Sequence, residues 1–285
     1  MDKLSLPLPL PDGETEESLF DYLKSYHFTD SSDKNEVINY LKNDFKRFVY
    51  TLSLVPQGSG NLLEIGGNPY FTSMLLHKFR NYDLKYTNYF GGELHTQIQQ
   101  KVNDEGELIS FPYWNHNVEE SDLPFDDEYF DVVLCCEVIE HFVKSPLYAL
   151  MNIRKHLKEN GTLILTTPNV ARLENIAKMI SGGNIYDPYS GYGIYGRHNR
   201  EYNKHELYTL LTHCGFKIES IFSSDVHNNA SDSFYPVDKI LNLITDIPHR
   251  ELDLGQYIFV KATKSGEVDK RLPEWLYRSF EEQKG

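Results

Sequence analysis

Residues 62–71 read LLEIGGNPYF, an apolar run that passes through Glu64, Gly66 and Gly67 before a helix begins. Such a turn brings main-chain N–H groups close to a ligand at the N-terminus of a helix. The dinucleotide pattern GxGxxG is absent, because Asn68 stands where a further glycine would be needed. The stretch alone therefore predicts a strand, a tight turn and a helix, and leaves open whether the turn binds a nucleotide or is purely structural.

Around this turn, short apolar runs alternate with helix-length amphipathic segments. The apolar runs are residues 61–66, 84–90, 130–136, 161–167, 216–222 and 256–262. This alternation is typical of a parallel sheet flanked by helices. Residues 145–161 carry an apolar stripe at helical spacing and end on a glycine, which predicts a crossover helix. Residues 31–56 also have helical periodicity and stop at a proline, which predicts an N-terminal helical cap.

The composition limits the kinds of molecule that the protein is expected to bind and indicates the compartment in which it is expected to work. The chain has 285 residues with 28 Lys and Arg against 42 Asp and Glu, a formal charge of −14, which repels nucleic acids and anionic lipids. Nucleic acid is therefore not the expected substrate. The opening 14 residues contain three prolines without a basic start, and no later segment has 18 uninterrupted apolar residues, so neither export nor a membrane span is predicted. Three cysteines without CxxC spacing indicate reduced thiols and a cytoplasmic location.

Residues 182–202, GGNIYDPYSGYGIYGRHNREY, interrupt the alternation with five glycines, five tyrosines and no sustained period. Long irregular loops within compact domains are either functional or disordered. Disordered segments are poor in aromatic residues, so we interpret this segment as a substrate loop, with a floppy insertion as the alternative.

Two further motifs follow the glycine turn in order: NVEESDLPFDDEYFDVVLCCEVIEH at residues 117–141 and LKENGTLILTTPN at residues 157–169. Over roughly residues 40–263 the chain resembles the class I S-adenosylmethionine-dependent methyltransferases, in particular bacterial families of types 11 and 23. The resemblance implies a Rossmann-like three-layer α/β sandwich whose seven-stranded, mostly parallel sheet ends in an antiparallel strand.

It also implies a single methyltransferase domain over residues 1–285. We divide it into an N-terminal helical cap (1–56), a cofactor-binding core (57–181), the Tyr/Gly-rich substrate loop (182–202), the end of the core sheet (203–263) and a C-terminal tail (264–285).

The same resemblance assigns the S-adenosyl-L-methionine pocket. Asn88 stands where an acidic residue usually holds the ribose, and Asn117 where an aspartate usually accepts from the adenine amino group. An asparagine oxygen can still accept both hydrogen bonds, but more weakly than a carboxylate. The residues expected to contact the cofactor are Glu64, Gly66, Gly67, Asn68, Asn88, Tyr89, Asn117, Val118 and Cys136.

Residues 135–142, CCEVIEHF, place Glu137, Glu140 and His141 at i, i+3 and i+4. On a helix these side chains share one face, just beyond the C-terminal edge of the fourth core strand, where open parallel sheets bind ligands. The spacing alone leaves two interpretations open: a metal or catalytic site, or a solvated helix start.

In the order EVIEH, TTPN and GRHNREY the chain resembles the small-RNA 2′-O-methyltransferases, and up to the first three ligands the ubiquinone-pathway O-methyltransferases. The resemblance implies a divalent metal (Mg, Mn, Fe, Co or Zn) held by Glu137, Glu140, His141 and His198. His198 and His141 are then the catalytic candidates. His198 as a metal-free base, or as a purely structural residue, is the alternative.

We expect from these features an O-methyltransferase that acts on a hydroxyl of a glycan, a sugar or a small natural product, in bacterial polysaccharide or secondary metabolism. The alternatives are a small-molecule N-methyltransferase, an RNA or protein methyltransferase, and a binding module that has lost catalysis. Residues 271–285 could form an amphipathic helix at a homodimer interface or a packed tail, and the sequence does not distinguish these.

Overall fold

The fold is known from a computed structural model that describes residues 4–30, 33–229, 235–244, 247, 250–269 and 271–277. Its strands are β1 (His27–Phe28), β2 (Ser59–Ile65), β3 (Asn81–Asn88), β4 (His95–Val102), β5 (Leu108–Asn115), β6 (Phe130–Cys136), β7 (Leu157–Pro168), β8 (Phe216–Ser224) and β9 (Tyr257–Lys264). Its α-helices are α1 (Glu16–Ser25), α2 (Lys34–Leu54), α3 (Phe71–Phe79), α4 (Pro146–His156), α5 (Leu173–Ile180), α6 (Lys204–His213) and α7 (Val237–Ile244). Three short 3₁₀ turns complete the described elements: η2 (Ile139–His141), η3 (Ile194–Gly196) and η4 (Arg250–Asp253).

One sheet contains all these strands, in the order β1-β4-β5-β3-β2-β6-β7-β9-β8. The strands from β5 through β3, β2 and β6 to β7 run parallel, and β9 is antiparallel to both of its neighbours. The expected Rossmann-like α/β class and the antiparallel last strand are therefore confirmed. The sheet is larger than the seven strands expected, because β4 folds back antiparallel on β5 and pairs with β1.

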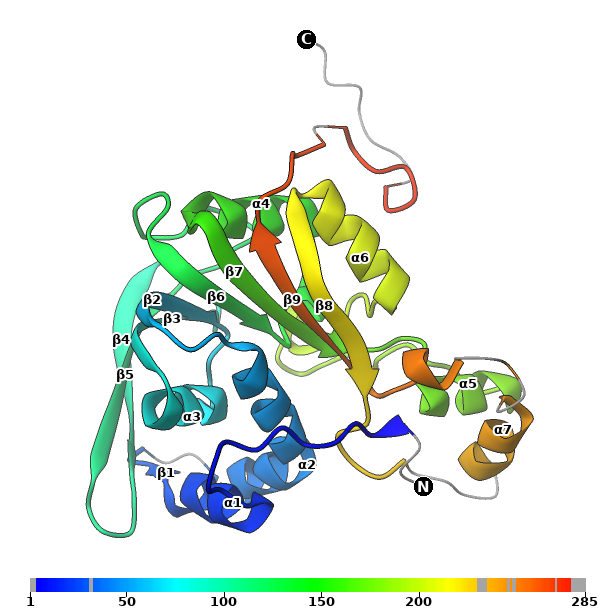
Figure 1. Ribbon diagram of the computed structural model, residues 1–285, viewed down its shortest axis with the longest axis horizontal. Coiled ribbons are helices and arrows are strands. Elements are labelled where there is room, and N and C mark those ends of the chain that lie inside the picture. The colour runs from blue at the N-terminus through cyan, green and yellow to red at the C-terminus, as the bar shows by residue number, and fades with distance from the viewer. Residues whose placement is uncertain are drawn as a thin grey trace.

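Helices cover both faces of the sheet, as a mostly parallel sheet requires (Figure 1). On one face α1, α2 and α3 bury side chains such as Phe48 and Met74 against Leu62 and Leu134. On the other face α4 and α6 pack against the alternate residues of the same strands, such as Leu63. Consecutive residues of the central strands thus point into opposite cores, which explains why strands such as β6 are apolar along most of their length.

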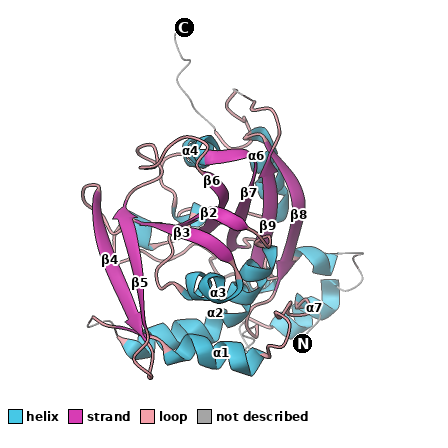
Figure 2. Ribbon diagram, turned by 60° about the vertical axis from the view of Figure 1, so that its left-hand side comes forward, coloured by secondary structure: helices cyan, strands magenta, loops and turns pink. Residues whose placement is uncertain are grey.

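The added hairpin of β4 and β5 extends one side of the molecule down toward α1 (Figure 2). At the opposite end, α5 and α7 pack on each other in a small separate cluster around Leu173 and Ile240. These two additions lie outside the sandwich predicted from the sequence.

Two expected helices can be compared directly with the structure. The helix expected within residues 31–56 is α2. The crossover helix is shorter than expected, because α4 ends at His156 and Leu157 already pairs with Phe130 of β6. Leu157 is fully buried in β7. An apolar side chain at this position is compatible both with the end of the helix and with the start of the strand, so the sequence did not separate the two.

None of the described helices combines the length and apolar character needed to cross a membrane. The described part of the C-terminal tail ends at residue 277, and residues 278–285 lie outside the described residues. Residues 271–277 contain a turn and no helix, so the interface helix considered for residues 271–285 does not begin there, and a helix further along stays a prediction.

Lys101 of β4 is fully buried between two aromatic rings, with its Nζ 4.1 Å from the ring centre of Phe71 and 4.7 Å from that of Phe28. Within the described part of the chain it has no ion pair, and its Nζ lies 4.0 Å from Met74 Sδ. Burial lowers the pKa of Lys101 to about 7. The folded protein therefore disfavours the charged form of this side chain.

Replacing Lys101 by methionine is expected to raise the free energy of unfolding at pH 7 by about 2–4 kcal/mol, since each pKa unit is worth about 1.4 kcal/mol. Because the folded pKa lies below the unfolded value of 10.5, the unfolded chain binds more protons between pH 7 and pH 10. Wild-type stability should rise with pH across that window, and Lys101→Met should lack this rise. Urea unfolding at several pH values measures both effects. The exposed Lys217→Met on β8 is the control, and equal stability of Lys101→Met and wild type would contradict the prediction.

Candidate cofactor and acceptor site

A cavity of about 150 Å³ opens at the carboxyl ends of the central strands. The chain turns from β2 toward β3 on one side and from β6 toward β7 on the other, and ligands bind at such a reversal in open α/β sheets. The cavity is lined by Ile65, Gly66, Thr87, Asn88, Tyr89, His116, Asn117, Val118, Glu137, Val138, His141, Phe142 and Tyr195. Five residues expected at the cofactor are among them: Gly66, Asn88, Tyr89, Asn117 and Val118.

Gly66 has a structural reason to be glycine. Its φ is +73°, and a Cβ at this position would lie 2.7 Å from Val138 Cγ2. The turn after β2 therefore passes directly against the segment after β6, which closes one side of the cavity.

Asn88 ends β3 and holds the glycine turn in place. Its Oδ1 accepts from the Asn68 N–H at 3.1 Å, and its Nδ2 donates to Tyr70 Oη at 2.8 Å. Tyr70 in turn stacks on Phe111, with ring centres 4.2 Å apart. The side chain of Asn88 thus braces the loop as well as lining the cavity.

Asn117, Tyr89 and Tyr195 form the wall at the expected adenine end. The Asn117 Oδ1 accepts from the Glu119 N–H at 3.0 Å, and its Nδ2 donates to Tyr195 Oη at 2.9 Å. The rings of Tyr89 and Tyr195 meet edge to face, 5.1 Å apart. Tyr195 was not identified individually from the sequence, although its loop was expected to bind substrate.

Thr87 supplies a test of whether the cavity fits a polar cofactor. Its Oγ1 is buried and has no hydrogen-bond partner among the described residues, and Thr87 is one of the residues that line the cavity. Buried hydroxyls are normally paired, so the unpaired Oγ1 fits a ligand that supplies a hydrogen bond.

The other expected cofactor residues do not line the cavity. Glu64 is buried and accepts a hydrogen bond from Ser73 of α3, and burial raises its pKa to about 7. Gly67 lies against the Glu64 carboxyl group, Asn68 donates through Nδ2 to Gln99, and Cys136 packs beside the α2 and α3 core. These residues support the turn from the side that faces away from the cavity.

The EVIEH segment does not form the α-helix expected from its spacing. Glu137 has a left-handed φ of +56°, and only Ile139–His141 make a single 3₁₀ turn. The shared helical face predicted for Glu137, Glu140 and His141 is therefore wrong, because the chain turns sharply as it leaves β6.

Three of the four expected metal ligands nevertheless meet. One donor atom from each of Glu140, His141 and His198 lies within 4.8 Å of the other two, and the two imidazole rings are 5.0 Å apart. Glu140 is completely buried, and its Oε2 accepts from Thr167 Oγ1 at 2.9 Å. Its Oε1 has no hydrogen-bond partner within the described residues and lies 3.9 Å from His141 Nε2.

Both histidines are held by their Nδ1 atoms. His141 Nδ1 donates to the Arg197 carbonyl at 3.0 Å, and His198 Nδ1 donates to Glu201 Oε1 at 2.9 Å. Glu201 also forms an ion pair with Arg172 at the start of α5. Each Nε2 is therefore left with a lone pair, which can accept a proton or bind a metal.

Burial dominates the electrostatics of this cluster. It raises the pKa of Glu140 and that of the neighbouring Glu137, and it lowers the pKa of His141, with the nearby His198 acting in the same direction. For His198, burial acts to lower the pKa, but the Glu201 hydrogen bond and the Glu140 charge outweigh it and raise the pKa. The site thus combines a carboxylate that resists ionisation with two imidazoles of different basicity.

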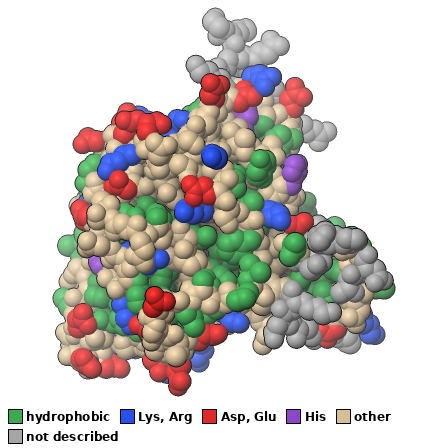
Figure 3. Space-filling view, in the orientation of Figure 1, with side chains coloured by type: hydrophobic (Ala, Val, Ile, Leu, Met, Phe, Trp, Pro, Cys, Tyr) green, Lys and Arg blue, Asp and Glu red, His purple; other side chains and the backbone are tan. Residues whose placement is uncertain are grey.

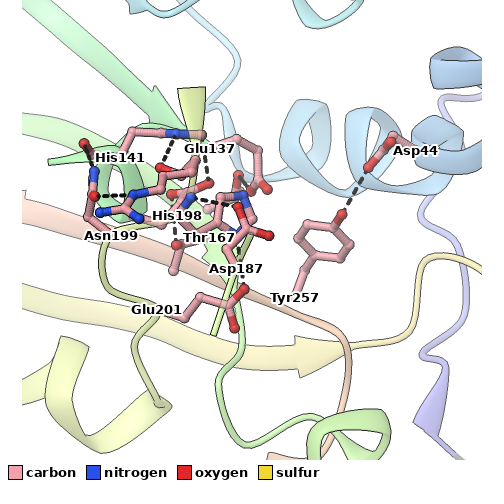
Figure 4. Close-up of polar contacts among 12 residues, drawn as sticks. Asp44, Glu137, His141, Thr167, Asp187, His198, Asn199, Glu201 and Tyr257 are labelled. Carbon is pink, nitrogen blue, oxygen red and sulfur yellow. Dashed lines mark hydrogen bonds and ion pairs between the residues drawn. The ribbon is translucent and has the colours of Figure 1, made fainter. Parts of the chain in front are cut away.

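Glu137 lies toward a different network, on the side of α2. Its Oε1 accepts from Thr166 Oγ1 at 2.9 Å and lies 3.9 Å from Arg47 Nη1. Arg47 is buried and pairs with Asp44, which also accepts from Tyr257 Oη at 3.1 Å. In Figure 4, His141, His198 and Glu201 gather on one side and the Asp44–Tyr257 bond lies on the other. Sequence analysis did not identify Arg47, whose contacts come from segments distant in the chain.

Known proteins resemble this chain in sequence and in fold. Ubiquinone biosynthesis O-methyltransferase of Rickettsia conorii is 30% identical over 117 residues, which are 40% of this chain and 37% of that protein. The enzyme of the same name from Rickettsia bellii is 24% identical over 164 residues, or 56% of this chain and 59% of that protein. The matches thus span well under two thirds of these relatives.

A solved SAM-dependent methyltransferase from Thermotoga maritima, described as a possible histamine N-methyltransferase, superposes with a TM-score of 0.50 at 16% identity, covering 87% of this chain and all of that one. This likeness concerns the fold alone. A sequence model of the methyltransferase domain matches residues 37–221, about two thirds of the chain. The chain belongs to the class I SAM-dependent methyltransferases.

Proposed function

We propose that this methyltransferase transfers the methyl group of S-adenosylmethionine to a hydroxyl of a sugar-like or small natural-product acceptor, with the help of a divalent metal. The observation that carries the proposal is the buried, unpaired Oε1 of Glu140, which faces two histidines whose Nδ1 atoms are already bonded. An N-methyltransferase of a basic amine has no need of such a cluster. The partial similarity to enzymes named as O-methyltransferases supports the same acceptor chemistry.

The donor set fits a first-row divalent metal. Two imidazoles and one carboxylate suit Mn²⁺, Fe²⁺, Co²⁺ or Zn²⁺, and Mg²⁺ if waters complete its octahedron. The carboxylate beyond His198 and the carbonyl beyond His141 are the outer partners that ligating histidines normally have. Glu137, the fourth ligand expected, points to Thr166 and Arg47 and is not needed for this set.

The chain's own residues hold and orient the reactants. A sulfonium methyl group is already activated, so the enzyme mainly has to align the acceptor oxygen with it. A bound divalent metal would lower the pKa of an acceptor hydroxyl and orient it. Thr167 fixes the Glu140 carboxylate through Oε2, and Glu201 fixes the ring of His198. Their hydrogen bonds keep Oε1 and Nε2 directed at one point.

The cofactor is proposed to lie along the cavity. Thr87, Asn88 and Asn117 would face its ribose and adenine, and Val118 would offer its main-chain N–H. Arg47 lies behind Glu137, which lines the cavity, and would pair with the carboxylate of the methionine moiety.

A neutral, hydroxyl-rich acceptor fits the surface around the site. Tyr186, Tyr189 and Tyr192 of the loop are 84–92% exposed, and aromatic faces of this kind can stack on sugar rings. On the face shown in Figure 3, Lys and Arg side chains are scattered among acidic ones and form no continuous basic patch. Together with a net charge of −14, this distribution disfavours an RNA acceptor. We also propose a cytoplasmic enzyme, in keeping with three free cysteines.

A metal-free mechanism is the second candidate, and one observation favours it. The Glu201–His198 hydrogen bond raises the basicity of His198, so Nε2 could take the acceptor proton directly. Both mechanisms use the same acceptor chemistry, and they differ in their response to chelation.

Removal of metal is expected to abolish turnover in a reversible way. After an acceptor is found by screening catechols and glycosides with vicinal hydroxyls, S-adenosylhomocysteine formation should fall at least 100-fold in EDTA. Adding Mn²⁺, Co²⁺ or Zn²⁺ beyond the chelator should restore it. Calorimetry with S-adenosylmethionine in EDTA is the control and should show that the cofactor still binds. Full turnover in EDTA favours the histidine base, and absence of cofactor binding would contradict the whole proposal.

A further inference from the structure

One loop carries both a wall of the cofactor cavity and a ligand of the candidate metal site. Residues 187–198 form this loop, and its ends meet where the His198 N–H donates to Asp187 Oδ2 at 3.0 Å. Near its tip, Tyr189 and Tyr192 are 92% and 91% exposed, whereas Tyr195 turns inward and lines the cavity. Tyr195 and His198 are only three residues apart.

The side chain of Tyr195 makes its hydrogen bond and its ring contact on the cofactor side. Its hydroxyl accepts from Asn117, and its ring meets that of Tyr89 edge to face. A ligand that fills the cavity must therefore touch Tyr195 or displace it. The position of Tyr195 is thus sensitive to whether the cavity is occupied.

The residues that follow Tyr195 form hydrogen bonds with the candidate metal ligands. The Arg197 carbonyl accepts from His141, and Asn199 donates through Nδ2 to the His141 carbonyl at 3.0 Å. The N–H groups of Asn199 and Arg200 also donate to the Glu140 carbonyl, at 2.8 and 3.2 Å. A short, well-bonded stretch of main chain therefore joins the cavity wall to all three candidate ligands.

We propose that Tyr195 is a positioning residue that couples occupancy of the cofactor cavity to the geometry of Glu140, His141 and His198. With cofactor bound, Tyr195 packs on it, and the segment that follows holds His198 in register with Glu140. This inference rests on the proposed function, because it assumes both a cofactor and a metal. It adds that the acceptor site is complete only when the cofactor is present.

Coupling of this kind is reciprocal. If the cofactor strengthens metal binding by some factor, the metal must strengthen cofactor binding by the same factor. Coupling between sites typically amounts to about 5- to 150-fold. The two affinities therefore provide independent measurements of one quantity.

The test is calorimetric titration of Mn²⁺ into the full-length protein, with and without saturating S-adenosylhomocysteine. Wild type should bind Mn²⁺ at least about 5-fold more tightly when S-adenosylhomocysteine is present. Tyr195→Phe, which keeps the ring and loses the bond to Asn117, should lose much of this difference, and Tyr195→Ala should lose all of it. Both variants should bind Mn²⁺ without S-adenosylhomocysteine nearly as wild type does.

Tyr208→Phe is the matched control, because Tyr208 is an exposed tyrosine of α6 outside the loop, and its coupling should equal that of wild type. Mn²⁺ binding that is indifferent to S-adenosylhomocysteine, or equal coupling in wild type and Tyr195→Ala, would overturn this inference alone. Absence of Mn²⁺ binding in every state would instead overturn the metal proposal and this inference with it. Circular dichroism of each variant, and the reverse titration of S-adenosylhomocysteine with and without Mn²⁺, separate loss of coupling from loss of fold.

Discussion

Replacing His198 by alanine is expected to lower turnover by about 10²- to 10⁴-fold, the contribution typical of a positioned acid–base group. Affinity for S-adenosylmethionine, measured without added metal, should change little, because His198 is not among the residues that line the cofactor cavity. Its ring is directed instead at Glu140 and His141, on the acceptor side. Turnover is measured as S-adenosylhomocysteine formed with the acceptor found by screening, and affinity by calorimetry.

His205→Ala is the matched control, since His205 is an exposed histidine on α6 and should leave turnover unchanged. The metal affinity of His198→Ala distinguishes the metal-assisted mechanism from the metal-free histidine base. Weakened Mn²⁺ affinity supports a ligand role, whereas loss of turnover with Mn²⁺ affinity intact supports a base. Turnover of His198→Ala within a few-fold of wild type would leave only the structural role for His198.

Much of the fold could be predicted because the determining signals are local. The six apolar runs correspond to β2, β3, β6, β7, β8 and β9, and each is buried on at least part of its length. The glycine turn could also be predicted. The left-handed φ of Gly66 and its close contact with Val138 require a residue without a side chain, and that requirement appears in the sequence as a glycine. Asn88 and Asn117, expected at the cofactor by resemblance to the family, both line the cavity.

The hairpin of β4 and β5 could not be predicted in the same way. Residues 95–100 are exposed or only partly buried, and the strand is polar, so no apolar alternation marks it. The contacts that fix β4 in place are made by the side chains of Gln99 and Lys101. Gln99 accepts a hydrogen bond from Tyr70, and Lys101 packs between the rings of Phe28 and Phe71. These contacts join segments that are tens of residues apart.

For the candidate metal site, three of the four residues expected from the sequence lie close together, but partly for a different reason than expected. Helical spacing grouped Glu140 with His141, but a left-handed Glu137 and a single 3₁₀ turn produce that grouping in the structure. His198 came from order and resemblance, and the structure brings it beside them. Tyr195 and Arg47 could not be found from spacing, because their partners lie far away in sequence.

Replacing Arg47 by methionine is expected to lower the free energy of unfolding by about 3–5 kcal/mol, because Asp44 would remain buried without its cation. The guanidinium also donates to Tyr40 Oη at 2.5 Å and lies 4.9 Å from the ring centre of Phe48. Urea unfolding should show a lower midpoint with an unchanged slope. Lys42→Met, an exposed site on the same helix, is the control and should cost little.

Adding Asp44→Asn to Arg47→Met should recover part of the loss, because the second change removes the uncompensated carboxylate. If the single and double variants are equally unstable, the loss arises from packing of the arginine stem and not from charge. If Arg47→Met is as stable as wild type, the buried ion pair contributes nothing to stability.

Arg47→Lys isolates the proposed contact between Arg47 and the cofactor. Lysine keeps the charge beside Asp44 but loses the forked donors that suit a carboxylate. Affinity for S-adenosylhomocysteine should fall by about 10-fold or more, the value of a charge-assisted hydrogen bond. Affinity for 5′-methylthioadenosine, which shares the adenosine but lacks the amino-acid carboxylate, should not change. Equal weakening of both ligands would mean that Arg47 shapes the cavity wall through Glu137 and does not bind the cofactor itself.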